Sequence, residues 1–503
     1  MQRRLKTLLF IAISIGAGIL HAPAQTPGTT GKHLTENPAP LPGSLTTDQM
    51  QADFDTLRKA LEEVHGGLYR FSTKPAINHL FDSCRARLNS IHSQRAFMIL
   101  LFEMLAQLRD GHMRLEADAA TTAALAQARL FPLRLMLEGD RLMVLYNDTP
   151  GDSTIRPGME LLTVNGHRAA HIIHTILPGI SGDGFIETFK RKRLERSFAP
   201  FYWLYVDQAT AFSITAKDNT GNTITTTLPG ILNAAREQNR AGNPVNTPII
   251  TNLARLDSAK DNVSLRFINN TDLACLRIRT FGGDAFISTL DLVFQTLHDK
   301  KTKALILDLR GNGGGVDEYG AALVSQLTNK PFRYFDRIHL TSILPSFTSW
   351  KPGTVENLRN GVVTDPKGGY LVTPQLHTGV GGQNPAARPF TGKLFVLLDG
   401  GTFSTAADVT ALLRHLTNAT FIGEESGGAA EGNTSGLNAL VKLPHSKLSL
   451  KIHLYEYWNA IPPGKKGRGT LPDHAVETHV ADWLQGIDAP MKRALLLATT
   501  SKF

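Results

Sequence analysis

The first hydrophobic pattern along the chain has the spacing of amphipathic helices. Apolar residues recur at helical intervals from Phe54 to Val64, after Thr46, which is a residue type that caps helix N-termini. The same spacing predicts further helices over residues 74–91 and 94–108. We therefore expect a helical N-terminal domain over residues 46–116.

The second pattern has strand character and covers residues 131–229. Runs such as LRLMLE and RLMVLYN suit strands, and Asn165-Gly166 after ELLTV is a typical hairpin turn. A helix is expected only near residues 188–196. Residues 230–247 are polar, and we interpret them as a linker. The pattern predicts a β-rich domain over residues 131–229.

The third pattern covers residues 248–503 and alternates continuous apolar runs with amphipathic segments. ALILD, KLFVLL and TFIG have the length and composition of strands that are buried on both faces. Strands of this kind separated by helices predict a mainly parallel sheet, and hence a multidomain α/β protein. Residues 342–391 are rich in Pro, Gly and Thr, and we interpret them as an excursion near the active site.

The first 24 residues carry a different signal. A positive MQRRLK segment precedes an apolar stretch of about 14 residues and the small-residue site Ala22-Pro23-Ala24, a pattern typical of a signal peptide. We expect cleavage before Gln25, a linker over residues 25–45 and an exported protein in the periplasm or outside the cell. An uncleaved anchor is the alternative. After cleavage we expect no stable membrane insertion, because no later segment is long and apolar enough.

Charge and cysteine content exclude several partners. The net charge is +9, but the longest basic block is KRKR and no basic stripe is interleaved with aromatics, so we expect no nucleic-acid partner. Cys84 and Cys275 are the two cysteines. They could pair in an exported protein or remain two buried thiols, and the sequence leaves both open. Without a Cys/His cluster we expect no metal and no cofactor.

Ser404 stands where a strand meets a helix. The buried run KLFVLL leads into DGGTFS, whose two glycines allow a sharp bend, and a helical pattern follows. This places Ser404 at a helix N-terminus beyond the carboxyl end of a strand, where open α/β sheets bind ligands. Ser404 is therefore a candidate nucleophile, although a simple helix cap would use the same residue.

Two more segments carry candidate chemistry. The run ALILD leads into RGNGGG, a glycine-rich loop whose backbone N–H groups can bind an anion or an oxyanion. A P-loop is excluded because no Gly-Lys-Ser/Thr follows. The segment LRDGHMR presents His112 after a predicted helix end.

In combination, these segments resemble the tail-specific (C-terminal processing) proteases of peptidase family S41. The matching motifs are Asp110-Gly111-His112, Asp308–Gly315, Gly401–Ala407, Phe421–Gly428 and Gly469–Asp473, in the family's order. The resemblance implies a ClpP/crotonase-like core over residues 248–503, a PDZ-like domain over residues 131–229, and a peptide or protein substrate. It also implies an oxyanion hole formed by the backbone N–H of Gly313 or Gly314 and that of Thr405.

The resemblance also bears on the general base. One branch of the family uses a lysine where this chain has Ala429, so the chain is more similar to the tricorn-like branch, in which a histidine activates the serine. We therefore expect His112 to be the base for Ser404. The orienting acid stays open between Asp110 and Glu456, because no acid precedes the closing Pro-Asp, and Ala407 replaces a glutamate of the family. A non-catalytic peptide- or lipid-binding protein on the same fold is the alternative function.

Overall fold

The structure is a computed structural model that describes residues 45–500 except 258–259, 270 and 349. The expected leader over residues 1–24 lies outside the described residues, as does nearly all of the expected linker. Among the described residues, no helix is long and apolar enough to cross a membrane.

The N-terminal region is helical, as predicted. It consists of α1 (Thr47–Val64), α2 (Lys74–Arg87), α3 (Gln94–Gln107) and the short α4 (Ala119–Gln127). A capping box starts α1: Thr46 accepts from the backbone of Gln49, and the Gln49 side chain accepts from the backbone of Thr46. The apolar positions of α1 are buried in one core with α2 and α3.

The β-rich region forms a six-stranded sheet. Its strands are β3 (Leu133–Glu138), β4 (Arg141–Asn147), β5 (Glu160–Val164), β6 (His167–Arg168), β7 (Ala211–Lys217) and β8 (Thr223–Pro229), with order β3-β4-β5-β7-β8 and β6 beside β5. Asn165 and Gly166 both have positive φ, which is the conformation of the predicted hairpin turn. Two helices, α5 (Ala169–Ile176) and α6 (Glu187–Tyr205), lie between β6 and β7.

The linker predicted over residues 230–247 is wrong. This stretch contains α7 (Arg236–Gly242), and α8 (Thr247–Leu256) follows at once. Arg236 is only 4% exposed, and its guanidinium donates to the carbonyl groups of Phe131 and Leu133. It also pairs with the buried Asp148. A polar residue is buried here because it satisfies backbone acceptors of another segment, which composition does not reveal.

The C-terminal region is built on a mainly parallel sheet, as predicted. It contains β10 (Val263–Phe267), β11 (Leu273–Ile278), β12 (Ala304–Asp308), β18 (Lys393–Leu398), β19 (Thr420–Gly423) and β22 (His474–Ala475), in that spatial order. The pairs from β11 to β22 are parallel, and β10 is antiparallel to β11.

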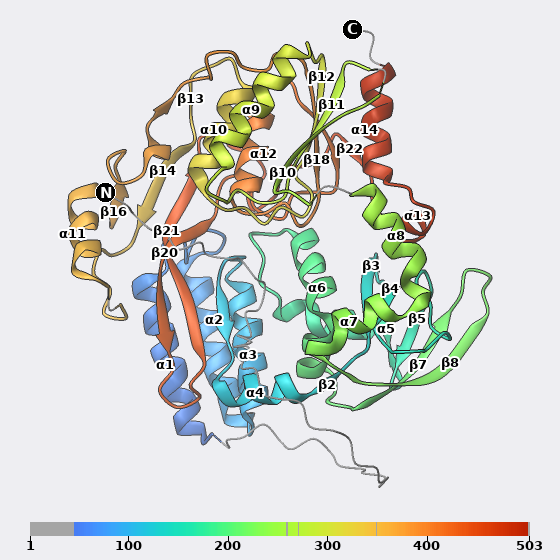
Figure 1. The fold of residues 1–503 in the computed structure, drawn as a ribbon. Helices are drawn as coiled ribbons and strands as arrows, with labels where there is room; N and C mark the ends of the chain where they lie inside the picture. Colours follow the sequence, from blue (N-terminus) through green and yellow to red (C-terminus); the bar gives the residue numbers. More distant parts are fainter. Residues whose placement is uncertain (1–44, 258–259, 270, 349, 501–503) are drawn as a thin grey trace, which may run out of the picture.

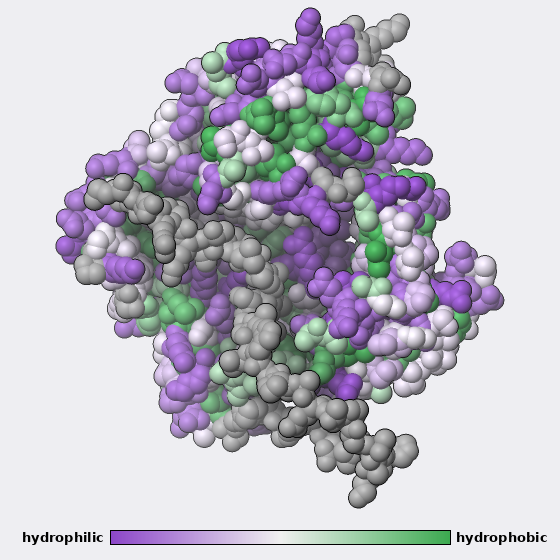
Figure 2. All heavy atoms as spheres, viewed as in Figure 1, coloured by the Kyte–Doolittle hydropathy of each residue, from purple (hydrophilic) through white to green (hydrophobic). Residues whose placement is uncertain are grey.

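Helices cover both faces of this sheet (Figure 1). The helices α9 (Phe286–Asp299), α10 (Asp317–Leu327) and α12 (Thr405–Leu416) share one core with it, and α14 (Ala489–Thr500) packs on the opposite face. Cys84 and Cys275 are both buried and unpaired, and they lie in different cores. The face in Figure 2 is mostly hydrophilic, with hydrophobic side chains gathered over the upper, sheet-bearing part.

A second six-stranded sheet joins the helical region to the core. Its members are β1 (Arg114–Glu116), β14 (Phe335–Leu340), β15 (Val362–Thr364), β16 (Tyr370–Val372), β20 (Thr434–Lys442) and β21 (Ser449–Asn459). The long strand β21 pairs with β1 at one end and β14 at the other, so it spans both regions. The expected excursion over residues 342–391 supplies β15, β16 and α11 (Pro352–Gly361).

Candidate active site

Ser404 lies at the turn between β18 and α12 in a strained backbone conformation. Its φ is 56° and its ψ is −133°, values that non-glycine residues rarely adopt. Such a residue costs on the order of 1–3 kcal/mol, and strain of this kind is concentrated at functional sites. The turn is held by Asp399, whose carboxylate accepts N–H groups from Gly401 at 2.9 Å and from Gly311 of the glycine-rich loop at 2.8 Å.

The glycine-rich loop and the Ser404 turn are interlocked through Asn312. Its backbone carbonyl accepts the N–H of Phe403 at 2.9 Å, and its side chain donates to the carbonyl of Ile278 at 3.0 Å. Its Oδ1 accepts the N–H of Gly314 at 2.9 Å. A Cβ on Gly314 would lie 2.6 Å from Cβ of Ser404, so only glycine allows this approach.

An ion-pair network fixes the start of the same loop. Arg310 donates to both Asp308 and Asp488, and Arg277 donates to Asp308 at 2.6 Å. Although burial opposes ionisation, the two guanidinium groups lower the pKa of Asp308 to about 2. Asp308 and Arg310 therefore anchor the start of the glycine-rich loop.

His112 comes from the helical region and meets Ser404 from a distant part of the chain. After α3, Arg109 adopts positive φ and ends the helix. The following backbone is held by Asp110, which accepts the N–H of His112 at 2.7 Å, and by Asp183, which accepts the N–H of Gly111 at 2.7 Å. His112 Nε2 then lies 3.0 Å from Ser404 Oγ, although 292 positions separate the two residues.

The environment of His112 keeps its imidazole neutral. Burial lowers its pKa to about 4, against the opposing attraction of Asp110. Its ring stacks on Phe403, with 4.5 Å between the ring centroids. Nδ1 is buried and has no hydrogen-bond partner among the described residues. The neutral imidazole can therefore accept a proton at Nε2.

Neither predicted orienting acid forms a hydrogen bond with a ring nitrogen of His112. Asp110 Oδ2 is 2.9 Å from His65 Nε2, and His65 Nδ1 accepts the N–H of Gly67. Because Nδ1 accepts, the proton of His65 is on Nε2 and is donated to Asp110. Glu456 instead lies 3.8 Å from Arg70 and 3.9 Å from His339.

Two further ionisable residues lie at the site that sequence reasoning missed. Asp183, 2% exposed, has its pKa raised to about 7 by burial and by the charge of Asp110. Its Oδ2 has no hydrogen-bond partner among the described residues. The ring of His453 lies edge-on to His112 at 6.0 Å, and burial lowers its pKa to about 3. Neither residue belongs to a motif, so no local signal could have found them.

Asp110, His112 and Asp183 together form a compact group of potential ligands. One nitrogen or oxygen of each lies within 4.8 Å of the others, and all three residues are buried. A metal ion would have to compete with His65 and two backbone N–H groups for the carboxylates. The hydrogen bonds already present suit a group that positions His112.

Ala429 stands where one branch of the S41 proteases has a catalytic lysine. It is 1% exposed and packs in a small cluster with Phe403, Phe189 and Ile186. The space beside Ser404 on this side is therefore filled by apolar side chains, which offer no base.

Comparison with known proteins gives a family match for part of the sequence and similar structures for the whole fold. Residues 272–476 match the sequence model of peptidase family S41. The fold is similar to the crystal structure of mature CPAF, with a TM-score of 0.63 and 14% identity over 91% of this chain and 99% of that one. It is equally similar to mature CPAF complexed with lactacystin, with a TM-score of 0.62 and 15% identity over 90% and 97% of the two chains. A comparison with curated proteins finds no match. Residues 272–476, which carry the glycine-rich loop and Ser404, are therefore similar to peptidase family S41, a family of serine peptidases.

Proposed function

We propose that the protein is an exported serine peptidase in which Ser404 is the nucleophile and His112 the general base. The observation that carries this is the 3.0 Å separation between His112 Nε2 and Ser404 Oγ. The strained backbone of Ser404 and the neutral imidazole support the same roles.

The mechanism follows from the positions of these groups. His112 Nε2 takes the proton of Ser404 Oγ as the oxygen attacks the carbonyl carbon of a peptide bond. The protonated imidazole then gives that proton to the leaving amine, which leaves an acyl-enzyme. Water attacks the ester while Nε2 takes its proton, and the returned proton restores Ser404.

The oxyanion would be bound by backbone N–H groups beside Ser404. Because the N–H of Gly314 already donates to Asn312, we assign the role to the N–H groups of Gly313 and Thr405. Neither of these donates a hydrogen bond to another described residue. Each donor of this kind contributes about 3 kcal/mol to transition-state stabilisation.

Asp183 is the acid that would position His112. Its unpartnered Oδ2 and the unpartnered Nδ1 of His112 are both buried. One ligand atom each of Asp110, His112 and Asp183 lies within 4.8 Å of the others, so the Asp183 carboxylate is close enough to act on the charge of His112. Asp110 then holds the backbone of His112, and Asp183 stabilises the imidazolium.

The finer assignments of fold and location belong to the same proposal. The parallel sheet with its glycine-rich turns supports a ClpP/crotonase-like core, and the Asn165-Gly166 hairpin in a small β-rich domain supports a PDZ-like fold. The leader pattern in residues 1–24 supports export to the periplasm or the cell exterior.

Labelling with a fluorophosphonate probe tests the nucleophile directly. Ser404→Ala should abolish both labelling and peptide hydrolysis, and His112→Ala should reduce both strongly. Lys442→Ala is the control and should keep both, because Lys442 is exposed on β20. If the wild-type protein is not labelled but still binds peptides or lipids, the chain is a binding protein on this fold and the proposal fails.

A further inference from the structure

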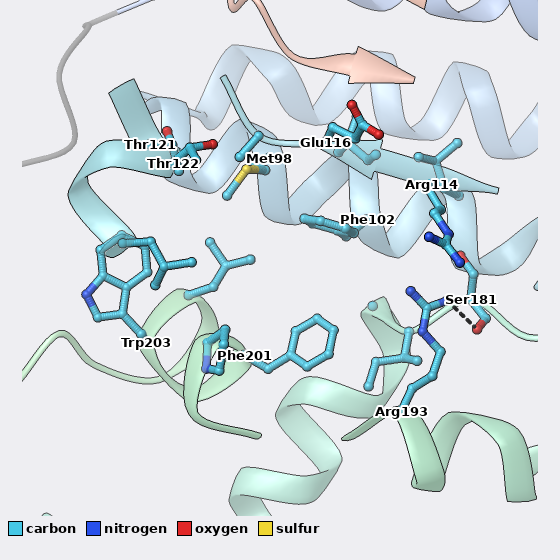
Figure 3. A pocket seen from close by; sticks show the side chains of 18 of the residues that line it. Met98, Phe102, Arg114, Glu116, Thr121, Thr122, Ser181, Arg193, Phe201 and Trp203 are labelled. Carbon is cyan, nitrogen blue, oxygen red and sulfur yellow. Dashed lines mark hydrogen bonds between the residues drawn. The ribbon is translucent and has the colours of Figure 1, made fainter. Parts of the chain in front are cut away.

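A pocket lies between the helical region and α6, and its lining includes Met113 and Arg114, which directly follow His112 in the chain. It is lined by α3, β1, α4 and the end of α6, and its volume is about 160 Å³ (Figure 3). Most of its lining is apolar, including Met98, Phe102, Leu125, Phe201 and Trp203. An apolar cavity of about 150 Å³ is large enough for a benzene ring, so this pocket can hold one aromatic or branched apolar side chain.

One end of the pocket is strongly basic. Figure 3 shows the guanidinium groups of Arg114 and Arg193 at this end, beside Ser181, with Trp203 at the other end. Arg193 donates to the carbonyl of Ser181 at 3.4 Å and lies over the ring of Phe189, and no carboxylate among the described residues forms an ion pair with it. Burial, with Arg114 and Arg196 nearby, lowers its pKa to about 10. Glu116 is the acid that also lines the pocket, on the same strand as Arg114.

The basic end is close to the reacting atoms. Arg114 is two residues from His112, and Ser181 is two residues from Asp183, which bonds to Gly111. Two residues span at most about 7 Å. A peptide whose carbonyl sits on Ser404 would therefore bring a nearby residue to this end of the pocket.

We propose that this pocket selects the substrate: it receives one large apolar side chain, and Arg114 and Arg193 bind a carboxylate next to it. The carboxylate is either the end of the peptide chain or an adjacent Asp or Glu side chain. The inference rests on the proposed peptidase function. It goes further by assigning the substrate's chemistry to residues outside the Ser404–His112 pair.

The charge on the pocket is the reason for a carboxylate. The guanidinium of Arg193 has the carbonyl of Ser181 and the ring of Phe189, 5.7 Å away, as partners, and neither carries a full negative charge. A bound carboxylate supplies that charge through two parallel hydrogen bonds. An uncharged apolar side chain alone would fill the pocket but would leave the guanidinium of Arg193 without a carboxylate partner.

Matched fluorogenic peptides test the selection. A peptide with Phe beside Asp should have kcat/KM about tenfold or more above one with Phe beside Asn, and about tenfold or more above one with Ala beside Asp. Peptides that end in Phe, with a free or an amidated terminus, distinguish the two sources of the carboxylate. Equal rates for all these peptides would overturn the inference, while cleavage itself would leave the proposed peptidase function intact.

Variants of the pocket give a second test, in which the kcat/KM values of two peptides are compared within the same variant. Arg193→Gln should reduce the Asp-to-Asn ratio of kcat/KM to about one, and Leu125→Trp, which fills the pocket, should reduce the Phe-to-Ala ratio. Arg191→Gln is the matched control on α6, because Arg191 bonds to Gly139 and Asp140 outside the pocket. An unchanged ratio in Arg193→Gln contradicts the inference.

Binding without turnover separates this inference from the peptidase mechanism. In the Ser404→Ala protein, the Phe-Asp peptide should change the fluorescence of Trp203, and Trp203→Phe should remove that change. If the protein shows no hydrolysis but this signal remains, the peptidase proposal fails and the pocket assignment stands as a binding site. If the signal arises with laurate but with none of the peptides, the pocket binds a fatty acid and the substrate assignment is wrong.

Discussion

Replacing Gly314 by alanine tests how the fold positions the nucleophile. Gly314 has a φ of +100°, and an added Cβ would lie 2.6 Å from Cβ of Ser404, 2.9 Å from the carbonyl oxygen of Phe403 and 3.0 Å from the nitrogen of Thr405. Two of these three atoms belong to the backbone of the Ser404 turn. The clash therefore cannot be relieved by rotating a flexible side chain.

The magnitude follows from these distances. Ordinary contact of a Cβ begins at 3.4 Å. Ser404 would have to move by about 0.8 Å, and a displacement of about 1 Å in an active site costs roughly 100-fold in rate. This corresponds to about 2.7 kcal/mol in the activation free energy. The unfavourable φ adds about 1–3 kcal/mol of destabilisation.

The rate of fluorophosphonate labelling, together with a thermal melt, measures both effects. Gly314→Ala should be labelled about 100-fold more slowly and melt a few degrees lower. Gly382→Ala is the matched control: nothing lies within 4 Å of its added Cβ, and Gly382 lies outside both the Ser404 turn and the glycine-rich loop. Labelling of Gly314→Ala at the wild-type rate would show that this contact does not position Ser404.

The remaining predictions concern proton transfer and the supports of the site. His112 must be neutral to accept a proton, and its lowered pKa keeps it neutral as pH falls. Besides the inflection near pH 7 expected from Asp183, kcat/KM should therefore decline on the acid side near pH 4; in the Asp183→Asn protein, which lacks the first inflection, a midpoint at pH 6.5 would contradict the burial argument. Asp183→Asn should remove an inflection near pH 7 and reduce kcat by about tenfold to hundredfold, while Asp183→Glu should restore part of it; an unchanged pH profile would leave Asp183 a purely structural role. Arg236→Leu should lower the free energy of unfolding by about 3 kcal/mol, measured by denaturant titration, because the buried Asp148 carboxylate loses one of its two ion-pair partners among the described residues; an unchanged midpoint would refute this.

Local patterns in the sequence predicted the elements that carry the site. The capped helix α1, the Asn165-Gly166 hairpin and the buried parallel strands each depend on residues a few positions apart, so spacing alone was sufficient. The bend before α12 follows from the two glycines before Ser404 in the same way, whereas the positive φ of Ser404 itself was not predicted. The interpretation of residues 230–247 as a linker is wrong, because the contacts that bury Arg236 come from residues about 100 positions away.

The geometry that turns these segments into a site depends on contacts between distant residues. The sequence by itself determined which segments carry a serine, a glycine-rich loop and a histidine. Only the tertiary structure decided that His112 lies 3.0 Å from Ser404, because α3 and the parallel sheet are brought together through β21. It also decided that Asp110 is bonded to His65, that Asp183 binds the N–H of Gly111 beside His112, and that two arginines meet at the pocket. Burial sets the pKa values there, and burial is a property of the assembled chain.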